Sequence, residues 1–162
     1  MGVIRSVFCA VLALVLAACA TEENLFLNFV NQKCVAEADE KQSPVNWKQA
    51  KVLNIAIRDG VYDPNETHMK VGEPTILRIA NNDNTPRYFI DGDFFDAVAV
   101  AQMSVGGAKY DRPCVSGVVI NAGKKAELRL VPRTAGIYFP AGSPFWVLGF
   151  EQNKPGIIFV GG

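Results

Sequence analysis

The sequence predicts an all-β fold of the sandwich class. Residues 51–58 and 75–80 are short runs of β-branched and aliphatic side chains bounded by turn-forming residues. Residues 125–131 alternate between charged and apolar side chains, which is typical of a half-buried antiparallel strand. Two further apolar runs, 136–139 and 156–160, complete a set of short strands separated by turns, as in a β-sandwich.

The first 18 residues have the pattern of a secretory signal. Arg5 precedes an apolar run over residues 7–16, and small residues then lead to Cys19. The run is too short to cross a bilayer as a helix, which takes about 20 apolar residues. The segment Leu16-Ala17-Ala18-Cys19 resembles the bacterial lipoprotein box, which implies cleavage before Cys19 and lipidation of its sulfur. The alternative is an ordinary cleaved signal followed by an incidental cysteine.

Lipidation of Cys19 would place the chain in the bacterial cell envelope, anchored to a membrane and facing the periplasm. Several acyl chains on one residue give stable anchoring, whereas a single chain gives marginal binding. Ala20 and Thr21 carry no acidic retention signal. By resemblance to enterobacterial sorting, we expect the outer membrane rather than the inner one.

Removal of residues 1–18 leaves 144 residues, the size of one domain with a short arm. The remainder has 15 basic and 16 acidic side chains, so its net charge suggests neither nucleic acid nor a strongly charged substrate as partner. We expect a tether with a short amphipathic helix over residues 19–49, because Leu25, Phe26, Phe29, Val30 and Val35 recur at roughly helical spacing. The alternative is a tether with scattered hydrophobic residues. The domain itself is expected over residues 50–162.

Two cysteines remain once Cys9 leaves with the signal and Cys19 is lipidated. Cys34 and Cys114 would then form a disulfide in an oxidising compartment. Such a bridge would stabilise the domain by roughly 4 kcal/mol on the chain-entropy model. The alternatives are two buried thiols, or a redox-active or metal-binding cysteine.

Two motifs give the chain a resemblance to a known family. The stretch Asn81-Asn82-Asp83-Asn84-Thr85-Pro86 is similar to the Asn-Asn-x-x-x-Pro segment that precedes the first histidine ligand of plastocyanin- and azurin-type cupredoxins. Residues 136–150 resemble the family's second ligand loop, Gly-x-Tyr-x-x-x-Cys-Ser-Pro-His-x-x-x-Gly-Met. The resemblance covers roughly residues 50–160. It implies a cupredoxin-like, antiparallel or mixed Greek-key β-sandwich, here with a short N-terminal helical arm.

The resemblance also implies that this chain lacks the type 1 copper ligands. Arg87 takes the place of the first histidine, Gly142 that of the cysteine, Phe145 that of the second histidine and Phe150 that of the methionine. A guanidinium is always charged and has no lone pair to offer a metal. We therefore expect a degenerate copper site with no cofactor. Arg87 would either contact a nearby aromatic ring as a cation–π pair or extend into solvent.

Atypical metal sites are the alternative to a chain without metal. The region around Asn84 and Pro86 also resembles the cupredoxin domains of bacterial iron-uptake proteins, which keeps copper or iron at an atypical site open. His68, the single histidine, is expected at the surface facing away from Met69, with a weak external copper site shared with a carboxylate as the alternative. The acidic run over residues 91–96 is expected to be a turn with solvated carboxylates rather than a hard-cation site.

The apolar loop is the candidate binding surface. It is formed by Pro144, Phe145, Trp146, Val147 and Leu148. The family resemblance implies docking of a partner protein at this loop, and contiguous exposed apolar residues often mark such surfaces. The alternative is that these residues fill the former copper cavity.

Three function classes remain after these assignments. The first is a non-redox binding or scaffolding subunit of an envelope or respiratory complex. The second is a copper- or iron-handling or electron-transfer accessory protein that uses an atypical metal site. The third is an enzyme or a subunit of one. No Gly-x-Ser-x-Gly or comparable nucleophile setting occurs in the sequence, so we expect no catalytic activity of its own.

Overall fold

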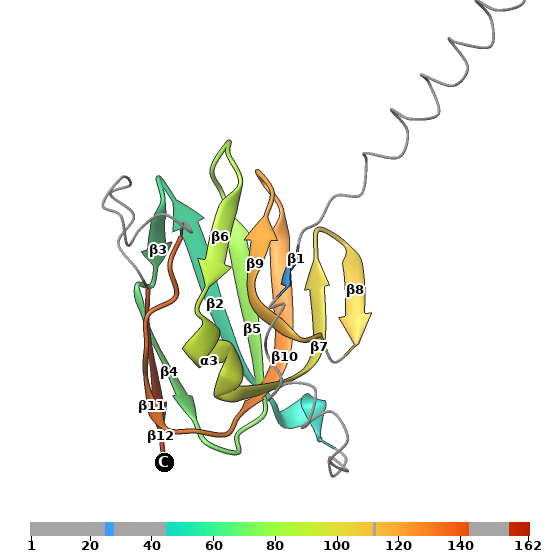
Figure 1. Cartoon of the computed structure of the whole chain (residues 1–162), viewed down its shortest axis with the longest axis vertical. Helices are drawn as coiled ribbons and strands as arrows, with labels where there is room; N and C mark the ends of the chain where they lie inside the picture. The colour runs from blue at the N-terminus through green and yellow to red at the C-terminus, as the bar shows by residue number, and fades with distance from the viewer. Residues whose placement is uncertain (1–24, 28–44, 112, 143–155) are drawn as a thin grey trace, which may run out of the picture.

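The computed structural model describes residues 25–27, 45–111, 113–142 and 156–162 of the 162-residue chain. Within these residues the chain forms strands with one 3-10 turn and one short α-helix (Figure 1). The elements are β1 (Leu25–Leu27), η1 (Trp47–Gln49), β2 (Lys51–Arg58), β3 (Val61–Asp63), β4 (Glu66–Lys70), β5 (Thr75–Asn81), β6 (Arg87–Ile90), α3 (Gly92–Asp96), β7 (Val98–Val105), β8 (Ala108–Asp111), β9 (Val115–Ile120), β10 (Lys125–Pro132), β11 (Gly136–Tyr138) and β12 (Ile157–Gly161). In this part of the chain, no helix is long and apolar enough to span a membrane.

The strands form one large sheet and two small ones. The large sheet has the order β3-β2-β5-β10-β7-β8, in which β2 and β5 are parallel and the other neighbours antiparallel. The small sheets have the orders β1-β9-β6 and β11-β12-β4, and β12 runs parallel to β4. In Figure 1, β6 and β9 lie in front of β2, β5 and β10. The predicted all-β sandwich with mixed strand directions is therefore confirmed.

The core lies between the large sheet and the strands that cover it. Alternate residues of β10 face inward, because Ala126, Leu128 and Leu130 are buried while the intervening charged residues are not. This confirms the strand predicted from the alternation over residues 125–131. Buried apolar side chains from β6 and β9 pack against the same core, chiefly Phe89, Val118 and Ile120. The short helix α3 adds Phe94 and Phe95 to the same cluster.

The N-terminal arm differs from the prediction where the structure describes it. Leu25–Leu27 form strand β1, which pairs antiparallel with β9, so the amphipathic helix is wrong at these three residues. An isolated helix in so short a segment is only marginally stable, because it must form all of its hydrogen bonds within itself. The edge of β9 instead offers unpaired backbone groups with which the segment can form hydrogen bonds as a strand. Residues 45–49, the last of the predicted tether, are described and include the 3-10 turn η1. The rest of the predicted signal and tether, including Cys19 and Cys34, lies outside the described residues.

Candidate functional site

The turn between β5 and β6 is organised by Asn81. Its side-chain Nδ2 donates to the carbonyl oxygens of Thr85 and Ile120, both at 2.8 Å, and its Oδ1 accepts from the N–H of Asp83 at 2.9 Å. The residue is 1% exposed, so these bonds satisfy polar groups that water does not reach. Asn81 therefore fixes the path of the chain from β5 toward Arg87.

Asp83 connects this turn to the β2–β3 hairpin. Its Oδ1 accepts from the N–H of Asp59 at 2.6 Å, and its Oδ2 accepts from the N–H of Gly60 at 3.0 Å. Asp59 and Gly60 both have positive φ, 50° and 72°, as the Asp-Gly pair of a tight hairpin turn requires. The Asp83 carboxylate therefore joins its own turn, between β5 and β6, to the β2–β3 turn, which is distant in the sequence.

Arg87, the first residue of β6, forms an ion pair with the same carboxylate. Its Nε donates to Asp83 Oδ2 at 2.6 Å, and the two side chains are 20% and 8% exposed. The contact found for Arg87 among the described residues is thus a carboxylate, which neither predicted alternative had named. The loop aromatic residues of the cation–π alternative lie outside the described residues, so that alternative stays a prediction.

Tyr62 on β3 lies close enough to Arg87 for charge to act on its hydroxyl. Burial raises the pKa of Tyr62 well above its ordinary value, and the positive charge of Arg87 lowers it by a smaller amount. The Tyr62 hydroxyl donates to the carbonyl oxygen of Tyr88 at 2.7 Å. This bond satisfies the phenol in its neutral form and fixes β3 to the strand that begins with Arg87.

Because of the Asp83 carboxylate, we expect the free energy of unfolding to fall in acid. Burial raises the pKa of Asp83, but hydrogen bonds from Gly60, Asp59 and Arg87 and the arginine charge outweigh burial, so the pKa lies below its ordinary value. Its stabilising contribution is present above the pKa of an unfolded aspartate, about 3.9, and is lost as the pH falls through the lower pKa of the folded state. We expect Asp83→Asn to weaken the dependence of unfolding free energy on pH below about 4. Urea unfolding across a pH series measures this.

The exposed aspartate Asp63 on β3 supplies the control for that series. Asp63→Asn should leave the acid dependence close to that of the parent protein, because no ion pair of this side chain occurs in the described part of the chain. Equal acid dependence in the Asp83→Asn protein and the parent would contradict the role given to Asp83.

The structure brings the positions of Arg87 and Gly142 to neighbouring backbone segments. The N–H of Tyr88 donates to the carbonyl oxygen of Gly142 at 3.2 Å. Ile90 and Ala141 exchange two backbone hydrogen bonds, at 3.1 and 2.9 Å. The two places that the resemblance assigns to the first histidine and the cysteine are thus adjacent, as a shared site requires.

The chemistry of these two positions does not fit a type 1 copper centre. Such a centre takes imidazole and thiolate ligands. Arg87 offers a cation without a lone pair, and Gly142 has no side chain. Phe145, Phe150 and the other residues of the predicted docking loop, Pro144, Trp146, Val147 and Leu148, lie outside the described residues. The prediction of a chain without metal therefore stays a prediction.

His68 lies at the surface, as predicted. Its side chain is 65% exposed, and its ring stacks on Phe159 with the centroids 5.0 Å apart. Nε2 lies 2.9 Å from Glu66 Oε1. Met69 is buried on the other face of β4, which confirms the predicted separation. Within the described ranges, no group of three or more histidine, cysteine, aspartate or glutamate side chains could hold a metal.

Asp91 has a structural role that the sequence reasoning did not assign. Its Oδ1 accepts from the N–H of Phe94 at 3.0 Å and caps α3, while its Oδ2 accepts from the N–H of Phe139 at 2.7 Å. The predicted turn with solvated carboxylates is therefore wrong at Asp91. An aspartate three residues before a buried aromatic pair is a helix N-cap signal that could have indicated this.

Cys114 directly precedes β9 and is half-buried. Its side chain interacts with another group of the protein. Its predicted disulfide partner, Cys34, lies outside the described residues, so the bridge between the two stays a prediction.

Comparison with known proteins identifies the fold. No family model matches the sequence, and no curated protein matches it. Among solved structures, the chain is similar to the multicopper oxidase McoA from the hyperthermophile Aquifex aeolicus, with a TM-score of 0.53 and 15% identity over 76% of this chain and 32% of that one. The chain has a cupredoxin fold. A multicopper oxidase from Campylobacter jejuni matches with a TM-score of 0.51 and 10% identity over 76% and 32% of the two chains.

A third similar structure is the copper nitrite reductase from Nitrosomonas europaea. Its TM-score is 0.50 and its identity 14%, over 72% of this chain and 50% of that one. The cupredoxin-fold chain thus spans between a third and a half of the length of these copper enzymes. At such low identity the likeness concerns the fold alone.

Proposed function

We propose that this chain is a lipid-anchored periplasmic protein that uses a cupredoxin-like domain without a type 1 copper site for binding. Its role would be that of a non-redox scaffolding subunit in an envelope or respiratory complex. Cys19 would carry the lipid, and the outer membrane is the proposed location. The loop Pro144 to Leu148 would dock the partner protein.

The ion pair between Arg87 and Asp83 carries this proposal. In the place assigned to a metal-binding imidazole, the chain has a largely buried cation whose charge is compensated by a carboxylate. That carboxylate also holds the β2–β3 turn, so the pair belongs to the framework of this end of the sandwich. A metal ion here would meet like charge from Arg87.

The base of the proposed docking loop is fixed by described residues. The N–H of Gly156 donates to the carbonyl oxygen of Pro140 at 2.9 Å, and that of Ile157 donates to the carbonyl oxygen of Asn65 at 2.7 Å. Residues 140–142 are in turn joined to β6. A loop that starts and ends at fixed points is suited to present side chains to a partner.

Replacing Trp146 and Val147 with serine tests the docking loop. Crosslinking and recovery of the full chain from its own membranes should then yield about a tenth or less of the partner obtained with the parent protein, because buried aromatic residues dominate most interfaces. Val52→Ser with Val61→Ser, two exposed valines on β2 and β3, is the control and should leave recovery unchanged. Unchanged partners in the Trp146 and Val147 variant would remove the docking loop from the proposal.

Elemental analysis tests the metal-free part of the proposal independently. The full chain would be incubated with copper or with iron and then desalted. Stoichiometric retention of either metal would contradict the metal-free proposal and favour a metal-handling accessory protein. Loss of both metals is the expected result.

A further inference from the structure

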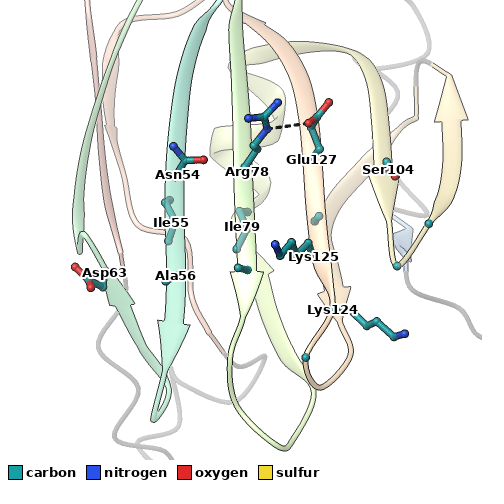
Figure 2. Close-up of a pocket in the computed structure, with 15 residues that line it drawn as sticks. Asn54, Ile55, Ala56, Asp63, Arg78, Ile79, Ser104, Lys124, Lys125 and Glu127 are labelled. Atoms are coloured by element: carbon teal, nitrogen blue, oxygen red, sulfur yellow. Dashed lines mark hydrogen bonds and ion pairs between the residues drawn. The ribbon is translucent and has the colours of Figure 1, made fainter.

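A groove crosses the outer face of the large sheet, on the side away from the core. Its volume is about 760 Å³, and it is lined by β2, β5 and β10 and by the turns that follow β7 and β9 (Figure 2). Sites for small organic molecules commonly measure about 300–1,000 Å³. The groove shares no lining residue with the turn from Asn81 to Arg87, so it is a separate feature of the molecule.

The floor of the groove results from two alanines in register. Ala56 on β2 lies beside Ala80 on β5, and Ala80 lies beside Lys125 on β10. The next outward-facing residues on the same two strands, Asn54 and Arg78, are longer. The alanines therefore leave a depression with an apolar floor, which Asn54 and Arg78 border on one side.

One cation, Lys125, lies over this floor, and a second, Arg78, borders it. Lys125 extends from β10 toward β5 across the groove, whereas Lys124 points away from it (Figure 2). In an antiparallel pair, the residue diagonal to Lys125 is Arg78, about 7–8 Å away between backbones, and long side chains reach across that distance. No ion pair of Lys125 occurs among the residues that the structure describes.

Arg78 keeps donors available although it is paired with Glu127. The ion pair uses its Nε, which lies 2.9 Å from Glu127 Oε2, and a guanidinium has further N–H donors on its two terminal nitrogens. Arg129 contacts the other oxygen of Glu127 at 3.4 Å, so two arginines share one carboxylate. With Lys125 added, this part of the sheet face has an excess of positive charge, although the whole chain has a formal net charge of zero.

We infer that this groove binds an amphiphilic organic anion. A phosphate or carboxylate head lies between Lys125 and the terminal nitrogens of Arg78, and the apolar body lies over Ala56 and Ala80 toward β3. Charge-assisted hydrogen bonds from a lysine and an arginine hold the head. Asp63, at the β3 end of the groove, disfavours a second negative group there.

Octyl phosphate is the probe for this site, used with the full chain below the micellar concentration. We expect saturable binding that shifts the methyl NMR signals of Ala56 and Ala80 and leaves that of the buried Ala97 unchanged. Inorganic phosphate tests the head alone and should bind more weakly. Octyl glucoside, which has the same alkyl chain and no charge, should not shift these signals.

Lys125→Gln should weaken binding of octyl phosphate about tenfold, because it removes one charge-assisted contact. Lys109→Gln, an exposed lysine of β8 outside the groove, is the matched control and should have no effect. Ala80→Leu should abolish binding by filling the floor. If the Ala80→Leu protein does not fold, the comparison of Lys125→Gln with Lys109→Gln is sufficient to test the inference.

Three outcomes would overturn the inference. The first is no saturable binding of octyl phosphate. The second is an equal loss in the Lys125→Gln and Lys109→Gln proteins, which would indicate general attraction to positive charge. The third is equal binding of octyl glucoside, which would indicate contact with the alkyl chain alone.

Discussion

Replacing Phe89 with alanine should lower the free energy of unfolding by about 3–5 kcal/mol. The side chain is fully buried on β6, between the two layers. Its ring makes edge-to-face contacts with Tyr62, Phe94 and Phe95 at centroid distances of 6.2, 5.8 and 6.1 Å. The substitution removes both the transfer free energy of the ring and these contacts, and it leaves a cavity that the surrounding rings fill incompletely.

Urea unfolding of the full chain measures this loss, and Phe159→Ala is its matched control. Phe159 is half-buried on β12 and stacks on the exposed ring of His68, so its removal opens a smaller cavity. We expect the Phe159 variant to lose less than half as much stability as the Phe89 variant. Equal losses would show that Phe89 is not the centre of the aromatic cluster.

The strands with the clearest sequence patterns were predicted closely, and those without such patterns were not. The run 51–58 matches β2, and the alternating run 125–131 matches β10 with one residue added. Strand β7 was missed because its pairing with β10 contains an irregularity, which breaks the two-residue period. Strand β9 was missed because Gly117 lowers its β-propensity. Strand β1 depends on pairing with β9, which no local pattern of three residues can reveal.

The sequence indicated where the candidate site lies, but it did not indicate the ion pair between Arg87 and Asp83. The resemblance assigned Arg87 and Gly142 to one ligand set, and the structure brings the two positions to neighbouring backbone segments. It did not predict the strand β6 that begins at Arg87. The four-residue spacing of Asp83 and Arg87 could have suggested an ion pair, but outside a helix that spacing carries no fixed geometry. The contact depends on the turn held by Asn81. Asp83 also binds the β2–β3 turn, which lies 23 and 24 residues earlier and is brought near by the fold alone.

Replacing Asn81 with alanine should lower the free energy of unfolding by about 2–4 kcal/mol. The change removes two hydrogen bonds that Nδ2 donates and one that Oδ1 accepts. It leaves buried carbonyl oxygens without the donor that Asn81 supplies, and a buried polar group without its partner is costly. Urea unfolding measures the loss, and the acid dependence attributed to Asp83 should weaken with it, because Asn81 also positions the N–H of Asp83.

Asn82 offers a control of the same residue type at the next position. Its side chain is exposed, while its backbone N–H donates to the carbonyl oxygen of Ile57 at 2.9 Å. Asn82→Ala keeps that backbone bond and should change stability by less than about 0.5 kcal/mol. If the two variants lost equal stability, the turn would not depend on the Asn81 amide. A large loss at Asn81 alone would mean that this end of the sandwich is held by polar contacts within the protein, a framework that positions Arg87 through Asp83.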